Sequence, residues 1–176
     1  DFAKRNLLPG NARKRHAAVE ERLKKLAVFS DSFAYNTIIK GKERVGVLAS
    51  GVSYQYGREV FPNAWFLKLA LPYPFPVKLF QRFAALVDKI YVLEENDPIL
   101  ETFARLNAPG KEIVGKEVFP LLGEMSQDAV RASLGQKAAD PGVEAGVPAR
   151  PPSLCAGCPH TAFFYNLGIL KVQSKG

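Results

Sequence analysis

In the first part of the chain, less polar residues recur among charged residues at the spacing of an α-helix. Between residues 11 and 26 the less polar positions recur four and three residues apart, which places them along one side of an α-helix. These positions are Ala12, His16, Val19, Leu23 and Leu26. The other side is mostly Arg, Lys and Glu. We expect an amphipathic helix with Asn11 as its N-cap, a position that Asn favours, and with His16 packed.

After Gly41 the pattern changes to short apolar runs that are separated by stretches of helical period. The expected strands are 44–50, 65–71, 89–93 and a short one at 113–114. Each of the first three is followed by a stretch whose apolar residues recur at helical spacing. Strands that alternate with helices are typical of a parallel sheet with helices on its faces. The sequence therefore predicts a doubly wound α/β domain with a mostly parallel sheet over residues 41–134.

Two adjacent carboxylates follow the third expected strand. Glu94 and Glu95 stand at the carboxyl end of that strand, where open α/β sheets bind ligands, so acid–base chemistry is conceivable. Neighbouring strand residues point to opposite faces, however, and acidic residues favour the start of a helix. We therefore favour a structural role for this pair. Asp97 is expected to cap a helix with Pro98 at its first position, and Ser126 to cap the last helix of the domain.

The only two cysteines stand three residues apart beside a histidine. A short turn between Cys155 and Cys158 lets both sulfurs point at one place, which suits a metal, an iron–sulfur cluster or a redox dithiol. Structural zinc needs four ligands, and with His160 only three candidates cluster here. In thioredoxin-like proteins the motif lies early in the fold, whereas here it follows a proline-rich stretch near the end. The residues alone leave the three readings open.

Composition limits the class of protein. The chain has 176 residues, of which 47% are apolar and 23% charged, with a formal net charge of +7, as in a basic globular protein. No run approaches the roughly 18 apolar residues of a membrane span, and the start is not a signal peptide. Two cysteines cannot form a disulfide framework, so we expect a cytoplasmic protein without a membrane partner.

Charge and glycine spacing bear on possible ligands. Much of the basic excess lies on the first helix, where it could meet phosphate, although a solvated helix face is the simpler interpretation. Gly51 and Gly57 lack the spacing of a dinucleotide or P-loop site. The aromatic residues between 54 and 66 fit a core better than a base-stacking surface. We therefore expect no nucleic-acid partner.

The ends of the sequence suggest a longer polypeptide. The chain begins without Met and ends just after an apolar run that resembles an opening helix, so we expect an internal piece. Residues 135–150 are rich in Ala, Gly and Pro without an apolar period, which is typical of a linker. The expected order is a helical segment with its connector at 1–40, the α/β domain at 41–134, the linker at 135–150 and the beginning of another domain at 151–176.

Several segments together resemble a known family. They are Val45–Gly51, Leu71–Pro76, Val92–Pro98, Gly115-Lys116 with Leu122–Glu124, and most specifically Cys155–His160. From about Arg44 onward the chain resembles the α subunit of indolepyruvate ferredoxin oxidoreductases, within the wider family of thiamine-diphosphate-dependent 2-oxoacid:ferredoxin oxidoreductases.

The resemblance implies a role for each part of the chain. Residues 41–134 would form a domain similar to the transketolase C-terminal domain, with a structural role and a basic surface that could help to hold coenzyme A. Residues 151–176 would begin the domain that binds thiamine diphosphate. Cys155 and Cys158 would be ligands of an iron–sulfur cluster, and Gly157 and His160 would line the cofactor site. Thr161 stands where many relatives have Arg.

The implied reaction is the oxidative decarboxylation of aryl pyruvates, such as indolepyruvate, to acyl-coenzyme A with ferredoxin as electron acceptor. Thiamine diphosphate with Mg²⁺ and iron–sulfur clusters would carry the chemistry. The expected partners are a β subunit or a fused equivalent, ferredoxin, the 2-oxoacid and coenzyme A. The chain lacks the activating Glu, the Mg²⁺-binding motif and cysteine-rich repeats, so by itself it should be inactive. The alternative is a non-catalytic α/β interaction domain with a partial zinc or dithiol site.

Overall fold

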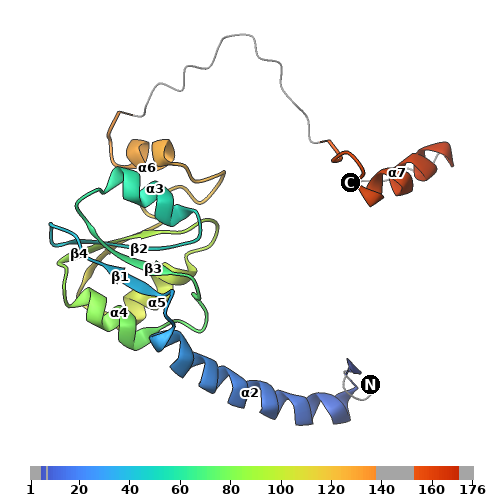
Figure 1. The fold of residues 1–176 in the computed structure, drawn as a ribbon, viewed down its shortest axis with the longest axis horizontal. Helices are drawn as coiled ribbons and strands as arrows, with labels where there is room; N and C mark the ends of the chain where they lie inside the picture. The colour runs from blue at the N-terminus through green and yellow to red at the C-terminus, as the bar shows by residue number, and fades with distance from the viewer. Residues whose placement is uncertain (1–4, 7, 138–152, 171–176) are drawn as a thin grey trace. The chain divides into compact units, whose positions relative to one another are not determined.

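A computed structural model describes residues 5–6, 8–137 and 153–170 of the chain. The chain divides into two compact units, Asp1–Ala139 and Asp140–Gly176, which are described separately. The first unit is built around a five-stranded sheet (Figure 1). Its strands are β1 (Thr37–Ile39), β2 (Val45–Ser50), β3 (Trp65–Leu69), β4 (Lys89–Leu93) and β5 (Glu112–Val114).

The strands lie in the order β1-β3-β2-β4-β5. Strands β2 to β5 are parallel to their neighbours, and only β1 runs antiparallel, beside β3. The first crossover leads from β2 to β3 on one side, and the next leads back past β2 to β4. The connections therefore change direction at β2, so that the carboxyl ends of β2 and β4 flank a topological switch point.

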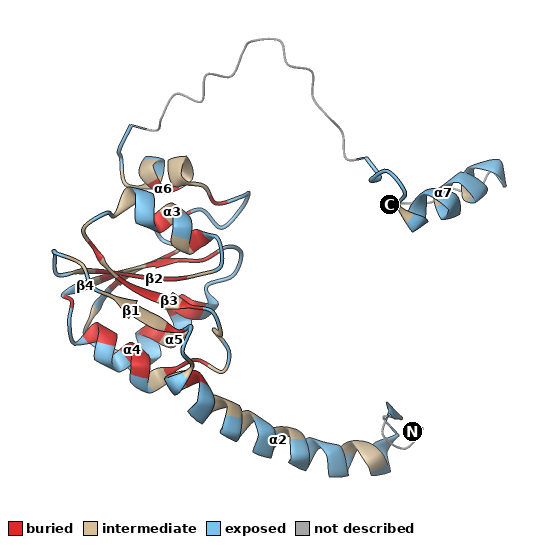
Figure 2. Cartoon of the chain, viewed as in Figure 1, coloured by how far each residue is buried: buried red, intermediate tan, exposed pale blue. Residues whose placement is uncertain are grey.

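Two layers of helices cover the sheet. Helices α3 (Ser53–Val60) and α6 (Gln127–Ser133) pack on one face, and α4 (Val77–Ala84) and α5 (Ile99–Asn107) on the other (Figure 1). Strand residues that alternate along β2 serve the two layers: Val47 packs toward α3 and Leu48 toward α4. Both are fully buried (Figure 2), which explains why the strand is a continuous apolar run.

This architecture confirms the predicted α/β class and most of the predicted elements. Strand β4 has the expected bounds, whereas β2 begins one residue later and β3 ends two residues earlier than expected. Strand β1 was not predicted, because three half-buried residues carry too short a pattern. It is held by the buried side chain of Asn36, whose Oδ1 accepts from the N–H groups of Ala70 and Leu71, each at 2.9 Å.

The first helix differs from its prediction in two respects. Helix α2 (Pro9–Ser32) begins before Asn11, with Leu8 as N-cap, because Pro9 supplies the fixed φ and the missing N–H that suit a first helical position. His16 is not packed: its side chain is 73% exposed and its Nε2 lies 3.0 Å from Glu20 Oε1. The other residues of the predicted apolar side, Ala12, Val19, Leu23 and Leu26, are half-buried, and Ser30 is the one buried residue of α2.

The carboxyl end of α2 is joined to the sheet domain through Asp31. Its Oδ1 accepts from the N–H groups of Lys78 at 2.8 Å and Leu79 at 3.1 Å, in the first turn of α4. A side chain from one helix thus caps another, where it meets free donors and the positive end of the helix dipole.

The second unit contains α7 (Pro159–Ile169), which follows the cysteine motif. None of its residues is buried within the described part of the chain. The predicted linker at 135–150 lies mostly outside the described residues. Across the described ranges, no helix combines the length and the apolar character that crossing a membrane requires.

Gly46 on β2 gives a test of this packing. A Cβ at this position would lie 2.6 Å from Cζ of Phe83, which belongs to α4, and 2.9 Å from Cγ2 of Val87, which follows it; both residues are fully buried. We expect Gly46→Ala to lower the free energy of unfolding by about 1 to 3 kcal/mol through overpacking. Urea unfolding followed by circular dichroism measures this. Gly10→Ala is the control, because a Cβ there meets nothing and helix propensity rises; equal stability of Gly46→Ala and the wild type would contradict the packing.

Candidate functional site

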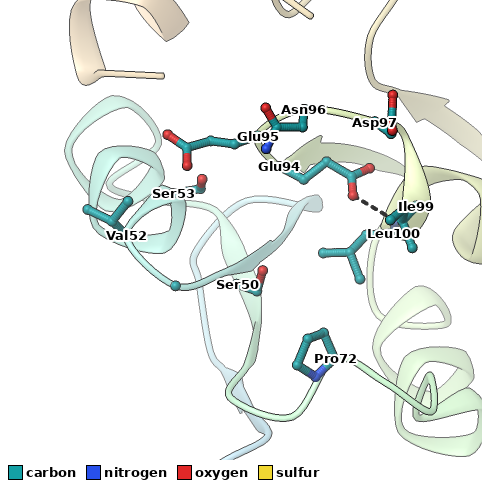
Figure 3. A pocket seen from close by; sticks show the side chains of 11 residues that line it. Ser50, Val52, Ser53, Pro72, Glu94, Glu95, Asn96, Asp97, Ile99 and Leu100 are labelled. Carbon is teal, nitrogen blue, oxygen red and sulfur yellow. Dashed lines mark hydrogen bonds between the residues drawn. The ribbon is translucent and has the colours of Figure 1, made fainter. Parts of the chain in front are cut away.

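A cavity of about 520 Å³ opens at the switch point of the sheet (Figure 3). It lies between the loop that leads from β2 into α3 and the loop that leads from β4 into α5. Its lining residues are Ser50, Gly51, Val52, Ser53, Pro72, Glu94, Glu95, Asn96, Asp97, Ile99 and Leu100. Ligands of open α/β sheets bind in this kind of crevice, and the volume suits a small molecule.

Glu94 caps the N-terminus of α5. Its two carboxylate oxygens accept from the N–H groups of Leu100 at 2.7 Å and Glu101 at 2.9 Å (Figure 3 draws the first bond). Asp97 was expected to cap this helix and does not: the N-cap is Pro98, without a side-chain bond. The N–H donors at the start of α5 bond to the Glu94 carboxylate instead. Asn96, with φ 59°, reverses the chain direction between β4 and α5.

Burial and hydrogen bonding act on Glu94 in opposite directions. Loss of water raises the pKa of its carboxyl, whereas the N–H donors of Glu101 and Leu100 and the charge of Lys116 lower it; the net pKa is raised. Both oxygens are already engaged with the backbone of α5, so the raised pKa has a structural cause. This geometry supports the structural role that we favoured for Glu94.

Glu95 points away from its neighbour, as adjacent strand positions predict. It is exposed, and its Oε1 receives one long hydrogen bond, 3.4 Å, from the N–H of Met125. Figure 3 shows Glu95 on the α3 side of the cavity and Glu94 on the α5 side. The two carboxylates therefore do not form an acid–base pair.

A second layer of contacts holds the β4 loop from behind. The ammonium of Lys116 donates to the backbone oxygen of Glu94 and to that of Pro120. The N–H of Lys116 donates to Glu101 Oε2 at 2.8 Å. Gly115 is required beside it, because a Cβ would collide with the Glu101 carboxylate. The Gly115-Lys116 segment thus fixes the loop that carries Glu94.

The two cysteines lie in a tight turn at the start of α7. The N–H of Cys158 donates to the Cys155 oxygen at 3.0 Å, and Gly157 takes φ 76° between them, which glycine adopts at no steric cost. Cys158 is the N-cap of α7, and Pro159 is its first residue. Cys155 is exposed and Cys158 half-buried, and both are free thiols.

His160 is the side chain that contacts this turn. Its Nδ1 lies 3.3 Å from Cys158 Sγ, and the rest of the ring is exposed. The turn and the helix start bring Cys158 and His160 together. Throughout the parts of the chain that the structure describes, no three His, Cys, Asp or Glu side chains form a group able to hold a metal ion.

Curated proteins of related sequence carry one name. The chain is 32% identical over 178 residues to indolepyruvate oxidoreductase subunit IorA of Methanothermobacter thermautotrophicus, covering 90% of this chain and 28% of that protein. Against IorA of Archaeoglobus fulgidus the values are 33% over 180 residues, 92% and 29%. Against IorA of Thermococcus kodakarensis they are 32% over 186 residues, 91% and 28%.

This chain is related to the IorA subunits. It spans less than a third of the length of these curated relatives. No protein family model matches it. A solved 2-oxoglutarate:ferredoxin oxidoreductase from Magnetococcus marinus is 19% identical and covers 74% of this chain and 24% of that one, with a TM-score of 0.49. A score of that size is too low to support an inference.

In this IorA-related chain, three of the five segments that carry the resemblance contribute to the switch-point cavity. Val45–Gly51 ends at it, Leu71–Pro76 contributes Pro72, and Val92–Pro98 contributes its acidic loop. Sequence reasoning singled out the glycine and the acidic loop but missed Ser50 and Ser53. No spacing signal marks two serines around a turn, and only the folded loops bring them to one cavity.

Replacing the Glu94 carboxylate by an amide should weaken the domain. We expect Glu94→Gln to lower the free energy of unfolding by about 1 to 3 kcal/mol, since one of the two donors at the start of α5 then meets an amide NH₂ group. Chemical unfolding monitored by circular dichroism measures it. Glu95→Gln, one residue along and exposed, is the matched control and should change stability by less than about 0.5 kcal/mol. Equal effects of the two variants would refute the capping role.

The raised pKa of Glu94 gives this contribution a pH dependence. In the unfolded chain the carboxyl has an ordinary pKa near 4.5, and in the folded chain a higher one. At pH values between these two pKa values, the folded state binds more protons than the unfolded state. The contribution of Glu94 to the free energy of unfolding therefore falls as the pH rises through that range. The stability difference between wild type and Glu94→Gln should be larger near pH 4.5 than at about pH 8. A difference that grows with pH would show a lowered pKa instead.

Proposed function

We propose that this chain works as part of a 2-oxoacid:ferredoxin oxidoreductase that oxidatively decarboxylates aryl pyruvates, such as indolepyruvate, to acyl-coenzyme A. The observation that carries the proposal is its sequence relation to IorA subunits over 90% or more of its length. The α/β domain supplies a rigid structural part, and the cysteine turn belongs to the cofactor site. The chain by itself is inactive in this proposal, because its site residues are incomplete.

The cysteine turn fits half of an iron–sulfur site. A four-iron cluster requires four thiolates, and this chain holds two, so the other ligands would come from other polypeptide segments. Two features support the fit. A backbone hydrogen bond closes the turn between Cys155 and Cys158, and the first N–H groups of α7 favour an anionic group at Cys158. His160 is placed to donate a hydrogen bond to the Cys158 sulfur.

Thiamine diphosphate, held with Mg²⁺, would supply the decarboxylation chemistry when bound. In this chain Gly157 and His160 would line its site: the glycine leaves room for close approach, and the exposed imidazole can donate or accept one hydrogen bond. The Mg²⁺ ligands would lie in other segments. The cytoplasm is the compartment that suits two reduced, accessible thiols.

Helix α7 supports assembly with further polypeptide. It exposes Phe163, Tyr165 and Ile169, each by more than half, although such residues are normally covered. In this proposal the rest of the thiamine-binding domain covers them, and a β subunit or fused equivalent completes the enzyme. Ferredoxin would accept the electrons. Coenzyme A would reach the site with help from the basic surface of the α/β domain.

Cysteine variants in the intact complex test the proposal. We expect the complex, purified without oxygen, to contain iron, labile sulfide and thiamine diphosphate, and to reduce ferredoxin with indolepyruvate and coenzyme A. Cys155→Ala and Cys158→Ala should each remove one cluster's worth of iron and lower this activity at least tenfold, since a cluster missing a thiolate is labile. Metal analysis, sulfide assay and electron paramagnetic resonance measure the loss.

The control is Ser153→Ala, an exposed change two residues before the motif, which should leave iron and activity unaltered. Zinc in place of iron, lost in the same two variants, would favour the alternative of an interaction domain with a zinc site. Absence of both metals, with full activity of the cysteine variants, would leave the pair as a dithiol and contradict the cluster.

A further inference from the structure

Helix α3 differs from the other helices of the α/β domain at its N-terminus. Side-chain oxygens of Asp31, Glu94 and Ser126 accept from first-turn N–H groups of α4, α5 and α6. Helix α3 has Val52 as N-cap, no side-chain cap and no acidic residue in its first turn. The N–H groups of Gln55 and Tyr56 both reach the Val52 oxygen. The two N–H groups before them have no partner among the described residues.

The hydroxyl of a serine that is otherwise buried opens on the cavity at this point. Ser53 is 3% exposed, and no described residue forms a hydrogen bond with its side chain. It lines the cavity, and Figure 3 shows its oxygen directed toward the loop of Glu95. This hydroxyl faces the cavity, so it and the start of α3 form a set of donors that a ligand oxygen would satisfy.

The loop from β4 to α5 carries carboxylates that need a hydrogen-bond donor or a positive charge. Glu95 and Asp97 are exposed carboxylates at the cavity rim, and neither forms an ion pair within the described residues. None of the residues that line the cavity is Lys or Arg. A phosphate or a dicarboxylate would meet uncompensated negative charge here, and a simple cation would leave the α3 donors unused.

A ligand that carries a carboxylate and an ammonium on one carbon satisfies both sides. We propose that this cavity binds an apolar α-amino acid. The carboxylate lies at the start of α3 with the Ser53 hydroxyl, and the ammonium lies toward Glu95. The carboxylate and the ammonium of an amino acid are attached to one carbon, so the protein groups that bind them must be neighbours. Figure 3 shows the Ser53 and Glu95 side chains on the same side of the cavity. The remaining walls are apolar: Val52, Pro72, Ile99 and Leu100.

Titration calorimetry on the full chain, without added iron or thiamine, tests this. The probes are L-leucine and L-phenylalanine, their 2-oxo acids, which lack the ammonium, and their amines, which lack the carboxylate. We expect both amino acids to bind, and each 2-oxo acid and amine to bind at least about tenfold more weakly, because each leaves one charged set unpaired. Binding of neither amino acid, or equal binding of the three compound types, overturns the inference.

Two variants divide the recognition into its halves. Ser53→Ala should reduce the preference for the amino acid over the amine about tenfold, and Glu95→Gln should reduce the preference over the 2-oxo acid by a similar factor. Glu59→Gln, an exposed carboxylate farther along α3, is the matched control and should change neither ratio. Circular dichroism verifies that each variant is folded. Ratios unchanged in both cavity variants would place any amino acid elsewhere.

This inference is independent of the proposed oxidoreductase function. Binding is measured without the cluster, the thiamine cofactor or partner subunits. Loss of binding would leave the cysteine experiments untouched, and an absence of iron in the intact complex would leave the calorimetry untouched.

Discussion

The carboxylate of Glu94 connects the sheet to the helix layer beneath it. Glu94 directly follows the last residue of β4. Its carboxylate accepts from two N–H groups of α5, and its backbone carbonyl accepts from the Lys116 ammonium. The cost of burying this carboxylate is offset only while all these donors remain in place. The switch-point cavity depends on this arrangement, because the loop from Glu94 to Asp97 forms one of its sides.

The same device recurs through the domain. Asp31 on α2 caps the N-terminus of α4, and Ser126, the N-cap residue of α6, caps its own helix. The bond from Asp31 joins segments that are far apart in sequence: 47 residues separate Asp31 from Lys78. Helix N-termini that all approach one edge of a parallel sheet create a concentration of free donors there, and the protein supplies an internal acceptor for all but α3.

The predictability of each element follows from how local its cause is. The parallel strands were predicted because β2, β3 and β4 are buried on both faces and read as apolar runs. Ser126 was predicted as a cap because an N-cap bond spans three residues. Asp97 was assigned the role that Glu94 performs, because local spacing cannot show a carboxylate reaching six and seven residues ahead from a strand end. His16 was predicted to pack from periodicity alone, which indicates a helix face but not what covers it.

The candidate sites divide in the same way. The cysteine turn was visible in sequence because its geometry is local: one glycine, one backbone bond and one helix start position Cys155, Cys158 and His160. Ser53 was invisible, because its importance comes from what is missing around it in three dimensions. Its hydroxyl faces the cavity beside a helix start that has no side-chain cap, and only the folded loops bring these groups together. The Glu94 carboxylate accepts from the corresponding N–H groups of α5, whereas the donors at the start of α3 face the cavity, which is where we propose that a ligand binds.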